Sequence, residues 1–154
     1  MRETLFRGKR ADNREWVEGF LVNKTDPLLG IKCWFILVQE YDTSCIDGKP
    51  THLKSLMTWY KVISETVGQY TGVEDKNGKK VFEGDILRYT PRPKCTIYYK
   101  VIWNQEWSRF ALVQWSTHKY HLYEWAQHET IKYCCEVIGN IHDNPDLLES
   151  LESN

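Results

Sequence analysis

The sequence lacks the long hydrophobic run that a membrane span needs. No stretch of about 18 apolar residues occurs in its 154 residues. The opening ten residues, MRETLFRGKR, are charged throughout, whereas a secretory signal has a basic region followed by an apolar one. We therefore expect no membrane partner, no standard secretion and a cytoplasmic location.

An excess of either charge is also missing. Twenty Lys and Arg face 21 Asp and Glu, which leaves a net charge of -1. Such a balance favours neither nucleic acid nor an anionic membrane as the general partner.

The five cysteines are odd in number and form no CxxC pair. Both features favour reduced thiols over a disulfide framework, and we predict that all five are free. Zinc ligands could come from a histidine and cysteine group, but adjacent cysteines on a strand point to opposite faces, so we predict no metal and no cofactor. That group consists of His118, His121, His128, Cys134 and Cys135.

Catalytic signatures are absent as well. The sequence has no GxSxG, HExxH, P-loop or GxGxxG pattern. Glu83 and Asp85 would share a face as an acid and base pair, but the glycine between them favours capping of a local turn. A calcium loop starting at Asp75 would need Glu at its twelfth position, where Ile86 stands. We predict no enzyme and no catalytic residues.

Aromatic residues are abundant, since seven Trp, nine Tyr and five Phe make up 14% of the chain. They favour strands and protein interfaces equally. An exposed aromatic surface on a small domain is covered most simply by another copy, so a homo-oligomer is the expected partner.

Short apolar stretches between turn residues predict a mainly β fold with small curved sheets, an SH3-like barrel element and a short C-terminal helix. We expect one unit over residues 1–154, with sub-units 1–66 and 67–154. KCWFILVQ, residues 32–39, is apolar on both faces and predicts a central strand covered on both sides. Residues 117–128 fit a helix and a strand equally well, and Asn144-Pro145 predicts the start of the final helix. The remaining strands are expected at 16–22, 86–89, 95–103, 110–115 and 133–141.

One segment is more specific than the rest of the chain. Residues 68–87, GQYTGVEDKNGKKVFEGDIL, contain Asn77-Gly78, the preferred pair for a type I′ turn, so we expect a hairpin between Val73 and Val81. Gly84 is expected to reverse the chain before the next strand.

This segment resembles the QYTG, DKNGK and EGDI block of the YopX family of phage and prophage proteins. FRGKR at 6–10, EWV at 15–17 and GF at 19–20 are similar to the start of that family, and EVIGNI at 136–141 with Asn144-Pro145 is similar to its end. The resemblance implies a phage-related accessory protein with a mostly β fold and self-assembly, and it brings no assigned catalytic residues.

The alternative function is nucleic-acid binding. Residues 86–105 contain four cations and no acidic residue, with aromatic side chains between them. Phosphates would pair with the cations and an exposed ring would stack on unpaired bases. By the two-residue period Tyr99 is expected to be buried, so Tyr98 is the stacking candidate. The candidate binding residues are Arg88, Arg92, Lys94, Tyr98 and Lys100.

Overall fold

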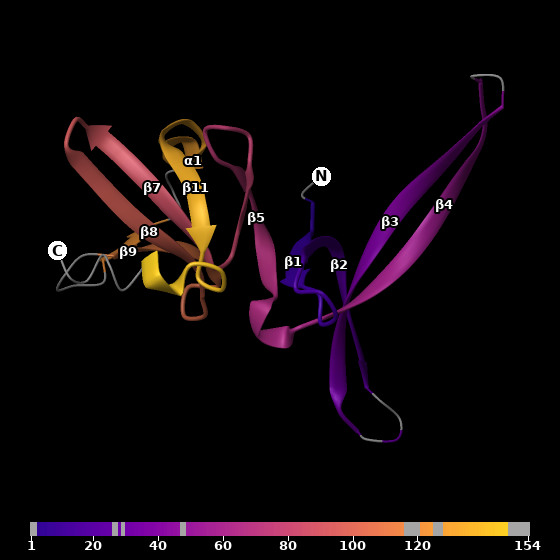
Figure 1. Ribbon diagram of the computed structural model, residues 1–154. Helices are drawn as coiled ribbons and strands as arrows, with labels where there is room; N and C mark the ends of the chain where they lie inside the picture. The colour runs from indigo at the N-terminus through magenta and orange to yellow at the C-terminus, as the bar shows by residue number, and fades with distance from the viewer. Residues whose placement is uncertain are drawn as a thin grey trace. The chain divides into compact units, whose positions relative to one another are not determined.

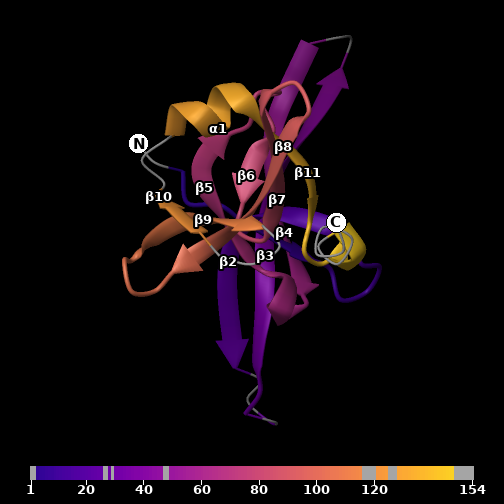
Figure 2. The same ribbon diagram turned by 90° about the vertical axis from the view of Figure 1, so that its left-hand side faces the viewer.

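The computed structural model describes residues 3–25, 28, 30–46, 49–115, 121–124 and 128–147. The chain divides into two compact units, an N-terminal unit Thr4–Gly68 and a C-terminal unit Gln69–Asn154 together with Met1–Glu3. Both are built mainly from antiparallel strands, which confirms the predicted fold class (Figures 1 and 2).

Four strands make the sheet of the N-terminal unit, in the order β4-β3-β2-β1. A single 3₁₀ turn, Ser64–Thr66, follows the last of them. The strands are β1 (Phe6–Lys9), β2 (Trp16–Thr25), β3 (Lys32–Ile46) and β4 (Lys49–Val62).

Strand β2 changes its partner at Gly19. Its first residues pair with β1, and from Phe20 onward it pairs with β3. A Cβ at Gly19 would lie 2.2 Å from the carbonyl oxygen of Leu37, so the strands approach closely only because this residue is glycine. Ile36 and Val62 are buried beside this crossing and form a small core.

Strand β3 is central in its sheet but is not covered on both sides. Within Lys32–Gln39 only Ile36 is buried, and its apolar neighbours are half-buried, so that part of the prediction was wrong. Past Leu37 the strand pairs with β4 alone in the part of the chain that the structure describes. This stretch of β3 and β4 is the long twisted ribbon of Figure 1.

The C-terminal unit contains a five-stranded antiparallel sheet in the order β10-β9-β8-β7-β11, a hairpin and a helix. Its core joins Leu87, Tyr99 and Val101 of the sheet to Val81 of the hairpin and Ile131 of the helix. The described sheet has β10 and β11 as its edges, and a barrel of SH3-like type stays a prediction. The elements are β5 (Gly68–Glu74), β6 (Lys80–Phe82), β7 (Asp85–Arg92), β8 (Cys95–Asn104), β9 (Arg109–Trp115), β10 (His121–Glu124), α1 (His128–Cys134) and β11 (Cys135–Asn140).

The predicted β5–β6 hairpin is confirmed, but its turn is not of type I′. Gly78 has a positive φ of 78° and Asn77 does not. The N–H of Gly78 donates to the carbonyl of Asp75 at 2.9 Å, and the N–H of Asp75 donates to the carbonyl of Lys79 at 2.8 Å. The loop is therefore a three-residue turn that ends in a left-handed glycine. A type I′ turn would need a positive φ at Asn77 as well, whereas here hydrogen bonds to a side chain stabilise the turn.

That organising side chain is the carboxylate of Asp75, which is 3% exposed. Its Oδ1 accepts the backbone N–H groups of Asn77 at 2.8 Å and Lys79 at 2.9 Å. Its Oδ2 accepts the N–H of Val137 in β11 at 2.9 Å. One buried carboxylate thus shapes the turn and fastens it to a strand 62 residues further along the chain.

Two boundaries near the C-terminus differ from the prediction. Tyr133 and Cys134 are the last residues of helix α1, whose residue Ile131 packs into the core. The last strand therefore covers only Cys135–Asn140. Within 117–128 the described residues His121–Glu124 form a strand paired with β9, and residues 117–120 and 125–127 lie outside the description.

The final helix begins at Pro145 as expected. Its continuation past residue 147 lies outside the described residues. The side chain of Asn144 accepts the N–H of Asn140 at 3.3 Å.

We expect Asp75→Asn to lower the free energy of unfolding by about 2–4 kcal/mol, because the amide loses charge and places a donor against backbone donors. Urea denaturation followed by tryptophan fluorescence would measure it. Glu106→Gln, an exposed carboxylate in the β8–β9 turn, is the matched control. A loss below about 0.5 kcal/mol, the usual range for surface substitutions, would contradict the organising role of Asp75.

Candidate functional site

An exposed row of apolar side chains crosses the N-terminal sheet. The register places Phe20 of β2 opposite Leu37 of β3, and Leu37 opposite Trp59 of β4. Residues directly opposite each other in antiparallel strands project to the same face, so the three side chains form a continuous line. Phe20 is 53% exposed and Trp59 is 44% exposed.

Neighbouring positions of the same face extend this row. Val22 and Phe35 form the next cross-strand pair, and the rings of Phe35 and Trp59 meet edge to face with centroids 6.5 Å apart. Met57, two residues before Trp59, is 48% exposed. We call this surface the apolar face, and it consists of Phe20, Val22, Phe35, Leu37, Met57 and Trp59.

Charges of opposite sign flank the apolar face. Lys24 and Lys61 follow it at one end, and the Lys24 ammonium lies 4.0 Å from the centre of the Trp59 ring. Glu18 precedes Phe20 by two residues at the other end, is exposed, and lies opposite Arg7 of β1 in the register. The face therefore has two lysines at one end and an exposed carboxylate beside an arginine at the other.

A second candidate surface is the β7–β8 hairpin, which carries every binding residue predicted from the sequence. Arg88 lies opposite Tyr98 in the register, and Ile86 lies opposite Lys100. Arg88, Tyr98 and Lys100 thus share one face, while Tyr99 is buried on the other, as predicted. We call this face, together with the tip residues Arg92 and Lys94, the cationic hairpin.

The sequence window around the cationic hairpin has no acidic residue, but the fold brings one to it. Glu136 of β11 lies opposite Arg88 and accepts a hydrogen bond from its guanidinium at 2.9 Å. The Lys76 ammonium is 2.8 Å from the same carboxylate. Hydrogen bonds from Lys76 and Arg88 lower the pKa of Glu136, and the bond to Glu136 raises the pKa of Arg88.

The two carboxylates considered as an acid and base pair both contact backbone groups. Asp85 is fully buried and its Oδ2 accepts the N–H of Phe82 at 2.8 Å. Glu83 accepts the N–H of Trp103 at 3.4 Å. The Asp85 bond caps the local turn, as the sequence favours, whereas the Glu83 bond reaches strand β8.

The cysteines of the histidine and cysteine group occupy different environments. Cys134 is exposed at the end of α1, and Cys135 is 1% exposed at the start of β11. Cys33, Cys95, Cys134 and Cys135 are free, and the side chain of Cys45 lies outside the description. Among the described residues no three His, Cys, Asp or Glu side chains gather as metal ligands, and His118 is not described.

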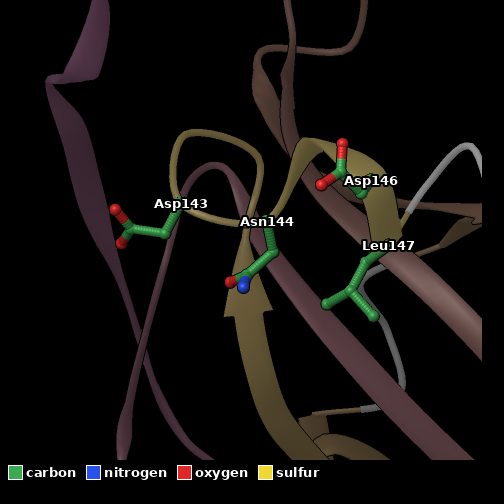
Figure 3. Close-up of a pocket in the computed structure, with 4 residues that line it drawn as sticks. All are labelled: Asp143, Asn144, Asp146 and Leu147. Atoms are coloured by element: carbon green, nitrogen blue, oxygen red, sulfur yellow. The ribbon is translucent and has the colours of Figure 1, made fainter.

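A shallow pocket of about 280 Å³ lies at the turn after β11, lined by Asp143, Asn144, Asp146 and Leu147 (Figure 3). The carboxylates of Asp143 and Asp146 lie on separate parts of the turn and do not converge in Figure 3. Asp143 accepts a hydrogen bond from the Asn140 side-chain amide at 2.7 Å. The pocket is therefore a gap beside a hydrogen-bonded turn, without convergent groups for a ligand.

Sequence reasoning missed two features of these surfaces, one residue and one row of residues. Glu136 is 31 positions or more from the cationic window, and only the β7–β11 register brings it there. The row across β2, β3 and β4 joins positions 20, 37 and 59, which look dispersed along the chain. A register prediction for the strands would have found both.

Comparisons with known proteins agree with this architecture. The sequence profile of the family described as YopX protein matches residues 5–149. The chain belongs to the YopX family. A crystal structure of protein EF1440 from Enterococcus faecalis is similar to the chain, with a TM-score of 0.56 and 23% identity over 96% of this chain and 99% of that one. That likeness shows the fold, and none of the curated proteins compared with the chain matches it.

Membership of the YopX family confirms the resemblance on which the sequence analysis relied. The motif residues behind it carry structural hydrogen bonds, as Asp75 does in DKNGK and Asp85 in EGDI. No described helix is both long enough and apolar enough to cross a bilayer.

We expect thiol reactivity to differ between the neighbouring cysteines. Burial raises the pKa of the Cys135 thiol to about 11, so it stays neutral and unreactive at a pH near 8. Because the neutral thiol is favoured in the fold, its contribution to stability is complete below the ordinary pKa of 9.0 and is lost as the pH rises through 11.

Mass-spectrometric footprinting with a thiol reagent tests this expectation. Cys95 and Cys134 should be labelled first in the native protein, and denaturation without reductant should expose all five thiols. Equal native labelling rates for Cys134 and Cys135, or fewer than five thiols after denaturation, would contradict it.

Proposed function

We propose that this YopX-family chain is a phage-related accessory protein that is non-enzymatic and self-associates through its apolar face. The observation that carries the proposal is the row Phe20–Leu37–Trp59, which exposes two large aromatic side chains on either side of Leu37 in one sheet. Exposing contiguous apolar surface of this kind to water costs free energy. That free energy is recovered when a partner covers the surface.

The ribbon next to the apolar face supports the same function. Past Leu37, strands β3 and β4 pair only with each other among the described residues, as far as Ile46 and Lys49. An isolated two-stranded hairpin is marginally stable in water and needs a third strand or a packed face. A second copy that lies across the apolar face and the ribbon would supply that packing.

The flanking charges favour a second copy of the same chain as the occupant, in one orientation. A two-fold axis across the strands reverses their direction, so Glu18 of one copy would approach Lys24 and Lys61 of the other. An axis along the strands would oppose lysine to lysine and is disfavoured. The same patch is then used by both copies, as in the commonest class of homodimer.

The non-enzymatic part of the proposal rests on how the buried acids are used. Asp75 and Asp85 are buried and accept backbone hydrogen bonds that fix turns, so neither carboxylate faces a position where a substrate could reach it.

The double variant Phe20→Ser with Trp59→Ser is expected to weaken self-association by at least about 30-fold, because central aromatic anchors dominate interface energy. Sedimentation velocity over a concentration series measures the effect. Trp107→Ser removes an indole that is 42% exposed in the other unit and is the matched control. A wild-type chain that stays monomeric at tens of micromolar would overturn the proposal, as would equal weakening by the control.

Charge reversal tests the orientation separately. Glu18→Lys is expected to weaken the dimer about fivefold, the upper range for exposed ion pairs, and Lys61→Glu introduced beside it should restore the affinity. If the second change weakens the dimer further, the strands of the two copies are not arranged as proposed.

A further inference from the structure

We infer that the cationic hairpin binds single-stranded nucleic acid. This function goes beyond self-association and uses different residues, Arg88, Arg92, Lys94, Tyr98 and Lys100. Its failure would therefore leave the proposed interface untouched.

The hairpin carries its cations from its middle to its tip. Lys100 and Arg88 lie on the same face of neighbouring strands, and Arg92 and Lys94 lie at the tip, beyond an irregularity in the pairing between Tyr89 and Arg92. From Lys100 to Cys95, the residue next to Lys94, strand β8 covers about 17 Å, at roughly 3.3 Å per residue. Cations spread over this length can follow several phosphates of an extended strand.

The tip of the hairpin is held in shape by its sequence. Lys94 has a φ of 66° and stands next to Pro93, and the strand pairing resumes at once with Arg92 opposite Cys95. A fixed turn presents its cations with little loss of conformational freedom on binding.

The surroundings of the hairpin add little negative charge. Strand β9 has no acidic residue, and β11 has only Glu136. That one carboxylate is shared by Arg88 and Lys76. No ion pair involves Arg92, Lys94 or Lys100 in the described part of the chain, so these three charges remain available to a polyanion.

Tyr98 favours single-stranded nucleic acid over a duplex as the partner. Its side chain is half-buried, lies directly opposite Arg88 in the register and projects to the same face as Lys100. Unpaired bases stack on such rings without sequence preference, whereas the bases of a duplex are already stacked.

The test is a fluorescence-anisotropy titration of a labelled oligothymidylate with the full chain, at several salt concentrations from about 50 mM upward. Binding is expected, with log Kd linear in log salt. Arg92→Gln with Lys94→Gln should lower the slope by about 1.4, since each phosphate contact in a single strand contributes roughly 0.7. Lys79→Gln with Lys132→Gln removes two exposed cations elsewhere and should leave the slope unchanged.

Two single substitutions separate stacking from charge. Tyr98→Ala should weaken binding about five- to 150-fold with an unchanged salt slope, and Tyr133→Ala, which removes a tyrosine that is 66% exposed on α1, should not. Glu136→Gln should tighten binding and steepen the slope, because it releases Arg88 and Lys76 from their shared carboxylate.

The inference is overturned if no binding occurs at the lowest salt concentration, or if the control variants lose as much affinity as the test variants. It is also overturned if heparin competes as well as the oligonucleotide does and Tyr98→Ala has no effect, since the hairpin would then be a general polyanion surface. Equal affinity for duplex DNA would overturn the assignment to single strands.

Discussion

The C-terminal unit depends on one buried carboxylate. Asp75 accepts two N–H groups of its own turn and one of β11, so a single side chain sets the β5–β6 loop and holds the edge of the five-stranded sheet against it. The N–H of Lys76 donates to the carbonyl of Cys135 at 3.0 Å beside it. Helix α1 ends at this junction, and the register that brings Glu136 to Arg88 begins there.

The motifs that identify the YopX family make further hydrogen bonds that hold turns to strands. In EGDI, Gly84 has a φ of 85°, donates its N–H to Val101 and accepts the N–H of Ile141. In EVIGNI, the Oδ1 of Asn140 accepts the N–H groups of His142 and Asp143, both at 2.9 Å. The most specific stretches of sequence therefore specify the fold, and the surfaces proposed for function lie on less distinctive residues. A motif can identify a family without marking a reactive site.

The two proposed surfaces lie on similar antiparallel sheets but would bind through different interactions, apolar burial on one and charge on the other. On the apolar face the strand register collects uncharged side chains whose burial would stabilise a second copy. On the cationic hairpin the register collects charges and one ring, which suit a flexible polyanion. In both cases the alternation of the strand sends neighbouring residues to the core, Ile36 in one sheet and Tyr99 in the other.

The sequence by itself determined the β-rich class, most strand positions, the hairpin at Asn77-Gly78 and the family, because turn residues and two-residue alternation are local signals. The same alternation also predicted that Tyr99 is buried and that Tyr98 lies on the opposite face. Only the tertiary structure decided the turn type, the helix that takes Tyr133 and Cys134 from the last strand, and the neighbours of each surface. Glu136 reaches Arg88, and Phe20 reaches Trp59, through pairings between strands distant in sequence. Local sequence patterns do not specify which residues of two distant strands pair, so this register is known only from the tertiary structure.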